Sequence, residues 1–326
     1  MTLVSNDPSW WPTISSFSIF SYFVVASSAA LVYDWALTFG QEIELIWKRR
    51  WSLVTVLYLN LRYIGLINAA LILLPNLPSI LLTDTVSDAM DALQNWLNFV
   101  VNAMLGVIMI HRLHVMYRRS RGILISLAVI ILAVTIACGV VTAKANSYIT
   151  AEALILSGTY QCIYNYGGDA QILISTNWIL YTTWEVLALC LAIWIAVKHF
   201  RELQQSSRGW TIRDCFTVLM QAHIVYFASF TAVSCFELGY LSPQLSNSSS
   251  MGSQIYGGAL EIFQLVQMFV LGPRLILSIR EYHDKLVADS DAGMSMTTMD
   301  FQEHVHISIG SDMSTGTDLS KAGSDV

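Results

Sequence analysis

Charged residues are scarce in this sequence. Asp, Glu, Lys and Arg together make up 12% of its 326 residues, about half of the roughly 25% that is usual in soluble proteins. Hydrophobic residues account for 55%, and the mean hydropathy is +0.55. A soluble chain of this length cannot cover its surface with so few charges. The composition therefore argues against a soluble enzyme and predicts an integral membrane protein.

Other features are missing as well, and each absence disfavours a class of function. The net charge of −6 provides no basic face, so we expect no nucleic-acid partner. The five cysteines have no paired spacing, which argues against a disulfide framework and a zinc knuckle. The sequence has no P-loop, nucleophile elbow or catalytic zinc motif, and no lysine in its last apolar stretch to hold retinal. We therefore expect neither enzymatic activity nor a bound metal or cofactor.

Long apolar runs locate the membrane spans. A bilayer core about 30 Å thick requires about 20 apolar residues per helical crossing. The sequence predicts an all-α, polytopic bundle of seven transmembrane helices within residues 13–279. We expect these helices at approximately 13–39, 51–74, 89–113, 122–143, 172–197, 213–240 and 255–279. Because no Lys or Arg precedes the first run, we expect an uncleaved helix rather than a signal peptide.

The positions of the basic residues predict the orientation. All of them except Arg62 and Lys144 fall in four segments on one side of a seven-span chain: 48–50, 112–121, 198–213 and 274–321. Basic residues concentrate on the cytosolic side of membrane proteins. We therefore expect residues 1–12 outside and the C-terminus in the cytosol. The N-x-S/T sequon at Asn247 falls in a predicted outer loop, where glycosylation is expected.

The segment after the last span changes character. Residues 280–289 have the pattern of a short amphipathic helix lying along the inner membrane surface. Residues 290–326 are rich in Ser, Thr, Gly, Met and Asp and have no apolar periodicity, which predicts a disordered cytosolic tail. We find no internal repeat with matching broken helices, and this disfavours a transporter without excluding one.

One segment resembles a known family. It runs from about residue 20 to 65 and contains Tyr33-Asp34-Trp35-Ala36-Leu37-Thr38, Glu42-Ile43, Ile46-Trp47-Lys48-Arg49-Arg50-Trp51 and Leu61-Arg62-Tyr63. This pattern resembles the N-terminal signature of a large family of fungal multi-pass membrane proteins, common in mushroom-forming species and defined by a domain of unknown function. The closing stretch at 272–278 also resembles the last helix of such proteins. The resemblance implies a membrane protein and no particular activity.

Arg62 is the most informative single residue, because a buried arginine in a membrane span needs a partner or water. Helical spacing places small and polar residues on its face: Thr55, Tyr58, Gly65 and Ala69. Asp34, on the preceding helix and nearer the cytosol, is within reach of its side chain. We expect an Asp34–Arg62 ion pair, either as a lock between the first two helices or as a switch that breaks on activation.

Other polar residues within the spans are candidates for a pocket. Asn95, Asn98 and Asn102 recur at i, i+3 and i+7, so they lie on one face of the third span, where they line a cavity or hold helices together. Glu185 lies near the middle of the fifth span and is either a proton- or ligand-binding group or a structural carboxyl. Glu237 and Glu261 lie near the outer ends of their helices and are either solvated or form the rim of a pocket. The sequence leaves open whether Cys162 and Cys235 form a disulfide.

An N-out, seven-span chain with an inner amphipathic helix and a disordered tail resembles the G-protein-coupled receptor plan. The motif match is poor, because His111-Arg112-Leu113 stands where the largest receptor class has an acidic-Arg-Tyr triplet. We expect a receptor-like protein of the plasma membrane that binds an unknown small ligand. A cytosolic adaptor or G-protein-like partner would contact the basic inner loops. The alternative is a small-solute or proton-coupled transporter, because architecture alone does not establish function.

Overall fold

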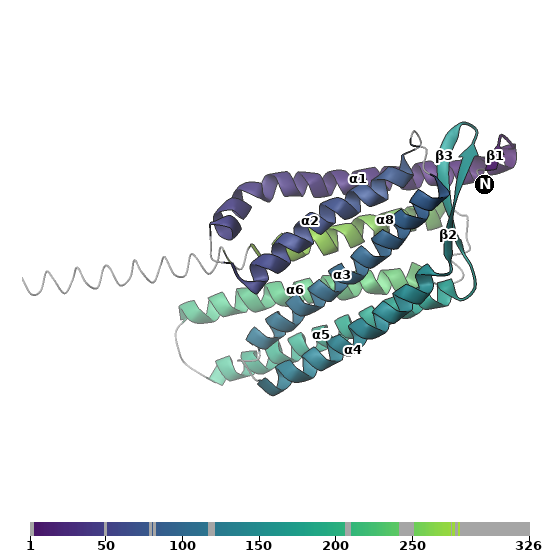
Figure 1. The fold of residues 1–326 in the computed structure, drawn as a ribbon. Coiled ribbons are helices and arrows are strands. Elements are labelled where there is room, and N and C mark those ends of the chain that lie inside the picture. The colour runs from purple at the N-terminus through teal and green to yellow at the C-terminus, as the bar shows by residue number, and fades with distance from the viewer. Residues whose placement is uncertain are drawn as a thin grey trace, which may run out of the picture. The chain divides into compact units, whose positions relative to one another are not determined.

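The structure is a computed structural model that describes residues 3–48, 51–77, 80, 83–116, 121–205, 210–240, 251–274, 276, 277 and 280. Residues Met1–Ile276 form one compact unit and Leu277–Val326 a second, and every element described below belongs to the first. The long helices of this unit lie side by side as a bundle, with a small sheet at one end (Figure 1). They are α1 (Trp11–Glu42), α2 (Leu53–Leu73), α3 (Asp84–Met116), α4 (Arg121–Asn146), α5 (Ala170–Gln205), α6 (Trp210–Tyr240) and α8 (Met251–Val266).

Local sequence signals explain where several helices begin and continue. The Ser52 side chain accepts a hydrogen bond from the Thr55 backbone N–H at 3.3 Å, which caps the start of α2. Pro12 lies in the first turn of α1, where its missing N–H costs no helical hydrogen bond. Short helical turns flank the long helices: Pro8–Trp10 and Leu74–Asn76 are 3-10 turns, and Ile43–Trp47 and Gln267–Leu271 are π-helical.

Six helical segments are long and apolar enough to cross a membrane: Pro8–Trp47, Leu53–Asn76, Asp84–His114, Ile125–Asn146, Ala170–Lys198 and Met251–Arg274. In α6, the apolar stretch within the searched residues, Ile224–Tyr240, is shorter than a full crossing. The structure therefore supports a polytopic helical membrane protein, while the count of seven spans stays a prediction. Several helices extend beyond the predicted spans, most clearly α5, which continues to Gln205.

Apolar side chains on the outside of the bundle show which surface faces lipid. On α4, five large apolar residues are exposed at helical spacing: Ile125, Val129, Leu132, Ile136 and Val140. They form one stripe along the helix, with no charged residue between Gly122 and Ala143. An apolar stripe of this length is unfavourable in water and favourable against lipid chains. The helices are therefore arranged as expected for a membrane-embedded protein.

A three-stranded sheet, which the sequence analysis did not predict, covers one end of the bundle (Figure 1). Strands β2 (Ile149–Leu156) and β3 (Thr159–Tyr166) pair antiparallel, and β1 (Leu3–Ser5) pairs parallel with β2. The hairpin turns at Ser157 and Gly158, with φ values of 49° and 80°, as a two-residue turn with both central residues left-handed requires. Pairing with β1 places the N-terminal segment and the α4–α5 connection at the same end of the bundle. Which side of the membrane this end faces stays a prediction.

The first helix of the bundle packs closely against the last. An added Cβ at Gly258 of α8 would lie 2.2 Å from Phe23 of α1, and one at Gly65 of α2 would lie 2.7 Å from Phe269. Small residues at such crossings let membrane helices approach closely without a hydrophobic driving force. The first contact joins the start of α8 to the N-terminal half of α1, and the second joins α2 to the π-helical turn after α8.

Some predictions concern parts of the chain outside the described residues. The sequon at Asn247 lies in the segment 241–250, between α6 and α8. The predicted surface helix at 280–289, except for the backbone of Arg280, and the predicted tail at 290–326 also lie outside them.

Candidate functional site

Three polar residues form one face of α1. Asp34, Thr38 and Glu42 are spaced at i, i+4 and i+8, so their side chains follow one another along the helix. All three are buried, and Glu42 has no exposed surface. The Thr38 hydroxyl donates to the Asp34 backbone carbonyl at 2.7 Å. Two carboxylates are therefore fixed inside the bundle one above the other, and both need cationic partners.

Arg62 of α2 lies between these two carboxylates. Its Nε is 2.9 Å from Glu42 Oε2, and its Nη1 is 3.6 Å from Asp34 Oδ2. Its Nη2 donates to the Trp35 backbone carbonyl at 2.9 Å and to the Thr38 hydroxyl. The structure thus places Arg62 beside Asp34, as the sequence predicted, but its nearer carboxylate is Glu42, which the sequence analysis did not assign to the site.

Neutral donors complete the surroundings of Glu42. Its Oε1 accepts hydrogen bonds from Trp47 Nε1 at 3.1 Å and from the Tyr63 hydroxyl at 3.2 Å. Its Oε2 accepts one from the Tyr58 hydroxyl at 3.4 Å. A buried carboxylate with several donors and a guanidinium is held in one position. Glu42 therefore joins α1, the π-helical turn after it, and α2.

Arg274 brings the end of the last span into the same cluster. Its Nε donates to Asp34 Oδ1, while about half of its side chain stays exposed. The charged cluster, defined as Asp34, Glu42, Arg62 and Arg274, thus contains two carboxylates and two guanidiniums. Its charges balance, and it connects α1, α2 and the segment after α8. This arrangement is the one a structural lock requires, and a switching role stays a hypothesis.

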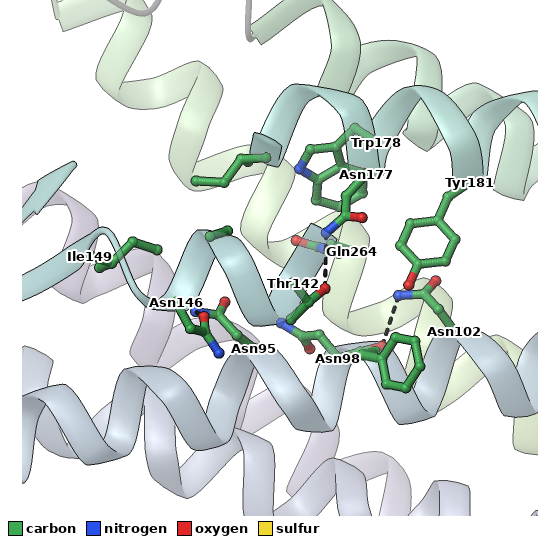
Figure 2. A pocket seen from close by; sticks show the side chains of 13 residues that line it. Asn95, Asn98, Asn102, Thr142, Asn146, Ile149, Asn177, Trp178, Tyr181 and Gln264 are labelled. Carbon is green, nitrogen blue, oxygen red and sulfur yellow. Dashed lines mark hydrogen bonds between the residues drawn. The ribbon is translucent and has the colours of Figure 1, made fainter. Parts of the chain in front are cut away.

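A second polar feature is a pocket of about 110 Å³ between α3, α4, α5 and α8 (Figure 2). The predicted asparagine face of α3 lines it with Asn95, Asn98 and Asn102. The other helices contribute Thr142, Ala145, Asn146, Ile174, Asn177, Trp178, Tyr181 and Gln264, and Phe99 and Ile149 complete the lining. We call it the amide pocket, because six of these side chains are carboxamides and none is charged.

Hydrogen bonds orient some of the amides and leave others available. Asn95 Nδ2 donates to Asn146 Oδ1 at 3.0 Å, at one end of the pocket, and Asn177 Nδ2 donates to the Thr142 hydroxyl at 2.9 Å (Figure 2). Asn146 Nδ2 and Asn177 Oδ1 are buried and have no hydrogen-bond partner among the described residues. A buried donor and a buried acceptor without partners are costly unless a bound molecule or water satisfies them.

A third group of polar side chains lies deeper in the bundle, where Glu185 of α5 is buried and hydrogen-bonded to Ser234 of α6. Glu185 Oε2 has no further partner in the described part of the chain. Arg112, which the sequence places at the cytosolic end of the third predicted span, is buried within the bundle, with its guanidinium 4.5 Å from the centre of the Tyr226 ring. Neither Glu185 nor Arg112 lines the amide pocket.

The two acidic residues predicted near the outer ends of their helices do not line the amide pocket either. Glu237 of α6 is buried rather than solvated, and Glu261 of α8 is partly buried. The two carboxyls are close enough to interact electrostatically. Gln264, one helical turn after Glu261, is the residue of α8 that reaches the pocket. The described lining of the amide pocket is therefore neutral, and neither carboxyl forms part of its rim.

Cys162 and Cys235 are both free thiols, so the structure does not contain the disulfide considered above. Cys162 lies buried in β3, and burial raises the pKa of its thiol above the ordinary value. The hairpin is attached to the bundle in another way. The carboxylates of Asp84 and Asp88 on α3 accept hydrogen bonds from the Ala153 and Ala151 backbone N–H groups of β2.

Comparisons with known proteins identify one matching segment. Residues 22–67 match the model of a family described as a family of unknown function, DUF6533. No curated protein matches this chain. The matched residues include Asp34, Glu42 and Arg62, so the family segment coincides with the α1–α2 part of the charged cluster, whereas Arg274 and the amide pocket lie outside it. The chain is thus a helical, membrane-type protein that carries a domain of unknown function at residues 22–67.

Proposed function

We propose that this protein is a receptor-like membrane protein without catalytic activity, and that it binds a small, uncharged, hydrogen-bonding solute in the amide pocket. The observation that carries the proposal is the pocket's lining. Six carboxamide side chains from four helices converge on one cavity, and two of them retain an unpartnered donor or acceptor. Asparagines that serve only to hold helices together would satisfy one another and leave no cavity.

The lining defines the chemistry of the ligand. Because none of the described side chains that line the pocket is charged, an ionic ligand would lose its hydration without gaining a counter-charge. Asn146 Nδ2 would donate to the ligand, and Asn177 Oδ1 would accept from it. A hydroxyl or a carboxamide provides both partners. The volume of about 110 Å³ is well below the roughly 300–1,000 Å³ of sites for drug-sized molecules, so the ligand is a small polyol, sugar fragment or amide.

The rest of the proposal concerns location and partners. We place the protein in the plasma membrane, with the basic segments on the cytosolic side. There, Lys48 and Arg201 belong to a basic surface for an adaptor or G-protein-like partner. The asymmetric distribution of basic residues supports this orientation. The charged cluster joins α1, α2 and the segment after α8. In the proposal, these three segments move together when the ligand binds.

A binding experiment tests the proposal. The purified protein is screened by thermal unfolding against neutral polyols, monosaccharides and small amides, with charged analogues of the same size in parallel. We expect a neutral compound to raise the unfolding temperature, and Asn177→Leu to weaken its binding about 2- to 10-fold for the lost hydrogen bond. Asn60→Leu is the matched control, because Asn60 is exposed and hydrogen-bonds only within α2 among the described residues. Binding of charged analogues alone, or equal loss in both variants, would contradict the proposal.

A second candidate function, a proton-coupled transporter, depends on Glu185. Its carboxyl is buried within α5 and has one oxygen without a partner in the described part of the chain. Carboxyls in this position bind and release protons in transporters. The two functions differ in one measurable property, because a transporter moves its solute across the membrane and requires the carboxyl for coupling.

A further inference from the structure

A second cavity lies between the N-terminal half of α1, the end of α2 and the tip of the β2–β3 hairpin. Its volume is about 230 Å³. Three stretches far apart in the sequence line it: Phe17, Ser18, Ser21, Tyr22 and Val25, then Pro75, Asn76 and Leu77, and finally Thr159, Tyr160 and Gln161. It shares no residue with the amide pocket or the charged cluster. We call it the hairpin cavity.

The hairpin cavity lies where a bilayer boundary is expected. The residues that line it belong to the N-terminal half of α1, to the turn after α2 and to the β2–β3 hairpin. Figure 1 shows the hairpin at the end of the bundle where α1 begins and α2 ends. Two of the α1 residues that line the cavity, Tyr22 and Val25, are 73% and 45% exposed. Apolar residues of a membrane span with this exposure face hydrocarbon. The cavity is therefore open towards lipid along α1 and closed by the hairpin at its other end.

The closed end carries hydrogen-bond acceptors. The Ser21 hydroxyl donates to the Asn76 backbone carbonyl at 2.9 Å, so its oxygen lone pairs are available to accept. Gln161 is nine-tenths buried, and its Oε1 has no hydrogen-bond partner within the described chain. None of the described side chains that line the cavity is charged, so a phosphate or ammonium headgroup would be buried there without a counter-charge. A ligand with one uncharged hydroxyl satisfies this end.

The walls define the rest of the ligand. Aromatic rings and a proline, at Phe17, Tyr22, Pro75 and Tyr160, give the cavity stiff, flat apolar sides. At about 230 Å³ it is too small for a whole lipid, so it holds the polar end and leaves the remainder along the exposed face of α1. A rigid, flat body loses less conformational entropy in such a site than a flexible acyl chain.

We propose that the hairpin cavity is a sterol-binding site in which the sterol hydroxyl reaches the Ser21 and Gln161 end, while the ring system lies along Tyr22 and Val25. The sterol enters from the surrounding leaflet without leaving the membrane. The site joins α1, α2 and the hairpin, so bound sterol stabilises the covered end of the bundle. This inference does not rest on the proposed ligand of the amide pocket.

The test uses the full-length protein in phosphatidylcholine vesicles that contain a photoreactive sterol. We expect crosslinks to map to residues 17–25 and 159–161, and unlabelled sterol to compete for them while diacylglycerol does not. Val25→Trp fills the cavity and should reduce crosslinking at least about 5-fold. Val32→Trp is the matched control, because Val32 is 50% exposed on α1 and does not line the cavity, and it should leave crosslinking unchanged.

A polar variant provides an independent test. Gln161→Leu keeps the size of the side chain and removes its amide, so sterol binding should weaken about 2- to 10-fold while the unfolding temperature without sterol stays close to that of the native protein. If Val25→Trp does not fold, this variant alone decides the outcome. Crosslinks spread evenly along the lipid-facing helices, equal competition by diacylglycerol, or unchanged binding in Gln161→Leu would overturn the proposal.

Discussion

Replacing Arg62 with leucine is the most informative test of the charged cluster. At an effective dielectric constant of about 20, unit charges 2.9 Å apart attract by about 6 kcal/mol, and charges 3.6 Å apart by about 5 kcal/mol. Desolvation offsets most of this attraction in the intact pair. Removing one partner leaves the other charge buried and costs about 3–5 kcal/mol. Arg62→Leu should therefore destabilise the fold by about this amount.

The structure also predicts how related variants compare. In Arg62→Leu, Glu42 loses the only cation within 4 Å among the described residues, whereas Asp34 keeps Arg274. Most of the cost therefore arises at Glu42, and adding Glu42→Gln to Arg62→Leu should recover more than half of the lost stability. Asp34→Asn alone should cost less, because Arg62 keeps Glu42 and the half-exposed Arg274 can reach water.

Thermal unfolding of the detergent-purified variants measures these differences. A loss of about 3–5 kcal/mol corresponds to a fall in Tm on the order of 10 °C for a protein of this size. Arg201→Leu is the control, because Arg201 is exposed at the end of α5, and its Tm should change little. If Arg62→Leu unfolds like the native protein, or if adding Glu42→Gln lowers Tm further, the charged cluster does not stabilise the bundle through the Arg62–Glu42 pair.

Four further predictions concern the hairpin and the orientation. Burial raises the pKa of the Cys162 thiol, and the thiolate is the reactive form. A water-soluble maleimide at pH 7.5 should therefore label Cys162 far more slowly than a cysteine introduced by Glu152→Cys at an exposed position. The labelling rate of Cys162 should increase as the pH rises. Mass analysis without reductant should show no bond between Cys162 and Cys235. Asp84→Asn weakens the charged acceptor for the Ala153 N–H and should speed hydrogen exchange in β2, with no change in α4. A C-terminal tag should resist protease in intact cells, because the C-terminus is predicted to lie in the cytosol. Cleavage of the tag would contradict the predicted topology.

The sequence predicts the helices well because membrane burial is a strong and simple constraint. A span tolerates few charges over about 20 residues, so the charge-poor runs coincide with the six helical segments that are long and apolar enough to cross a membrane, even though Arg62 and Glu185 lie inside two of them. The seventh span stays a prediction. The hairpin was missed because its strands lie in a stretch that was interpreted only as a loop. The Ser157-Gly158 pair between two segments that contain apolar residues could have predicted a hairpin turn, because Gly readily adopts a positive φ.

The candidate sites were predictable only in part. Arg62 and Asp34 stood out because each is a charge in apolar surroundings, and the i, i+3, i+7 spacing identified the asparagine face. Glu42 carries the same kind of signal, because it follows Asp34 and Thr38 at i+4 steps, but the sequence analysis did not extend the face that far. The contacts of Arg274, Asn146, Asn177 and Gln264 depend on how distant helices pack, and no local pattern specifies that packing.

In the proposed function, the amide pocket binds a small neutral solute without transporting it. The most direct measurement uses the protein in sealed liposomes with an imposed pH gradient and follows uptake of the neutral compound that binds best in the thermal screen. We expect saturable binding that Asn177→Leu weakens, and no accumulation inside the vesicles with either the native protein or Glu185→Gln. Accumulation driven by the pH gradient and abolished by Glu185→Gln would contradict the receptor-like function and establish the transporter in its place.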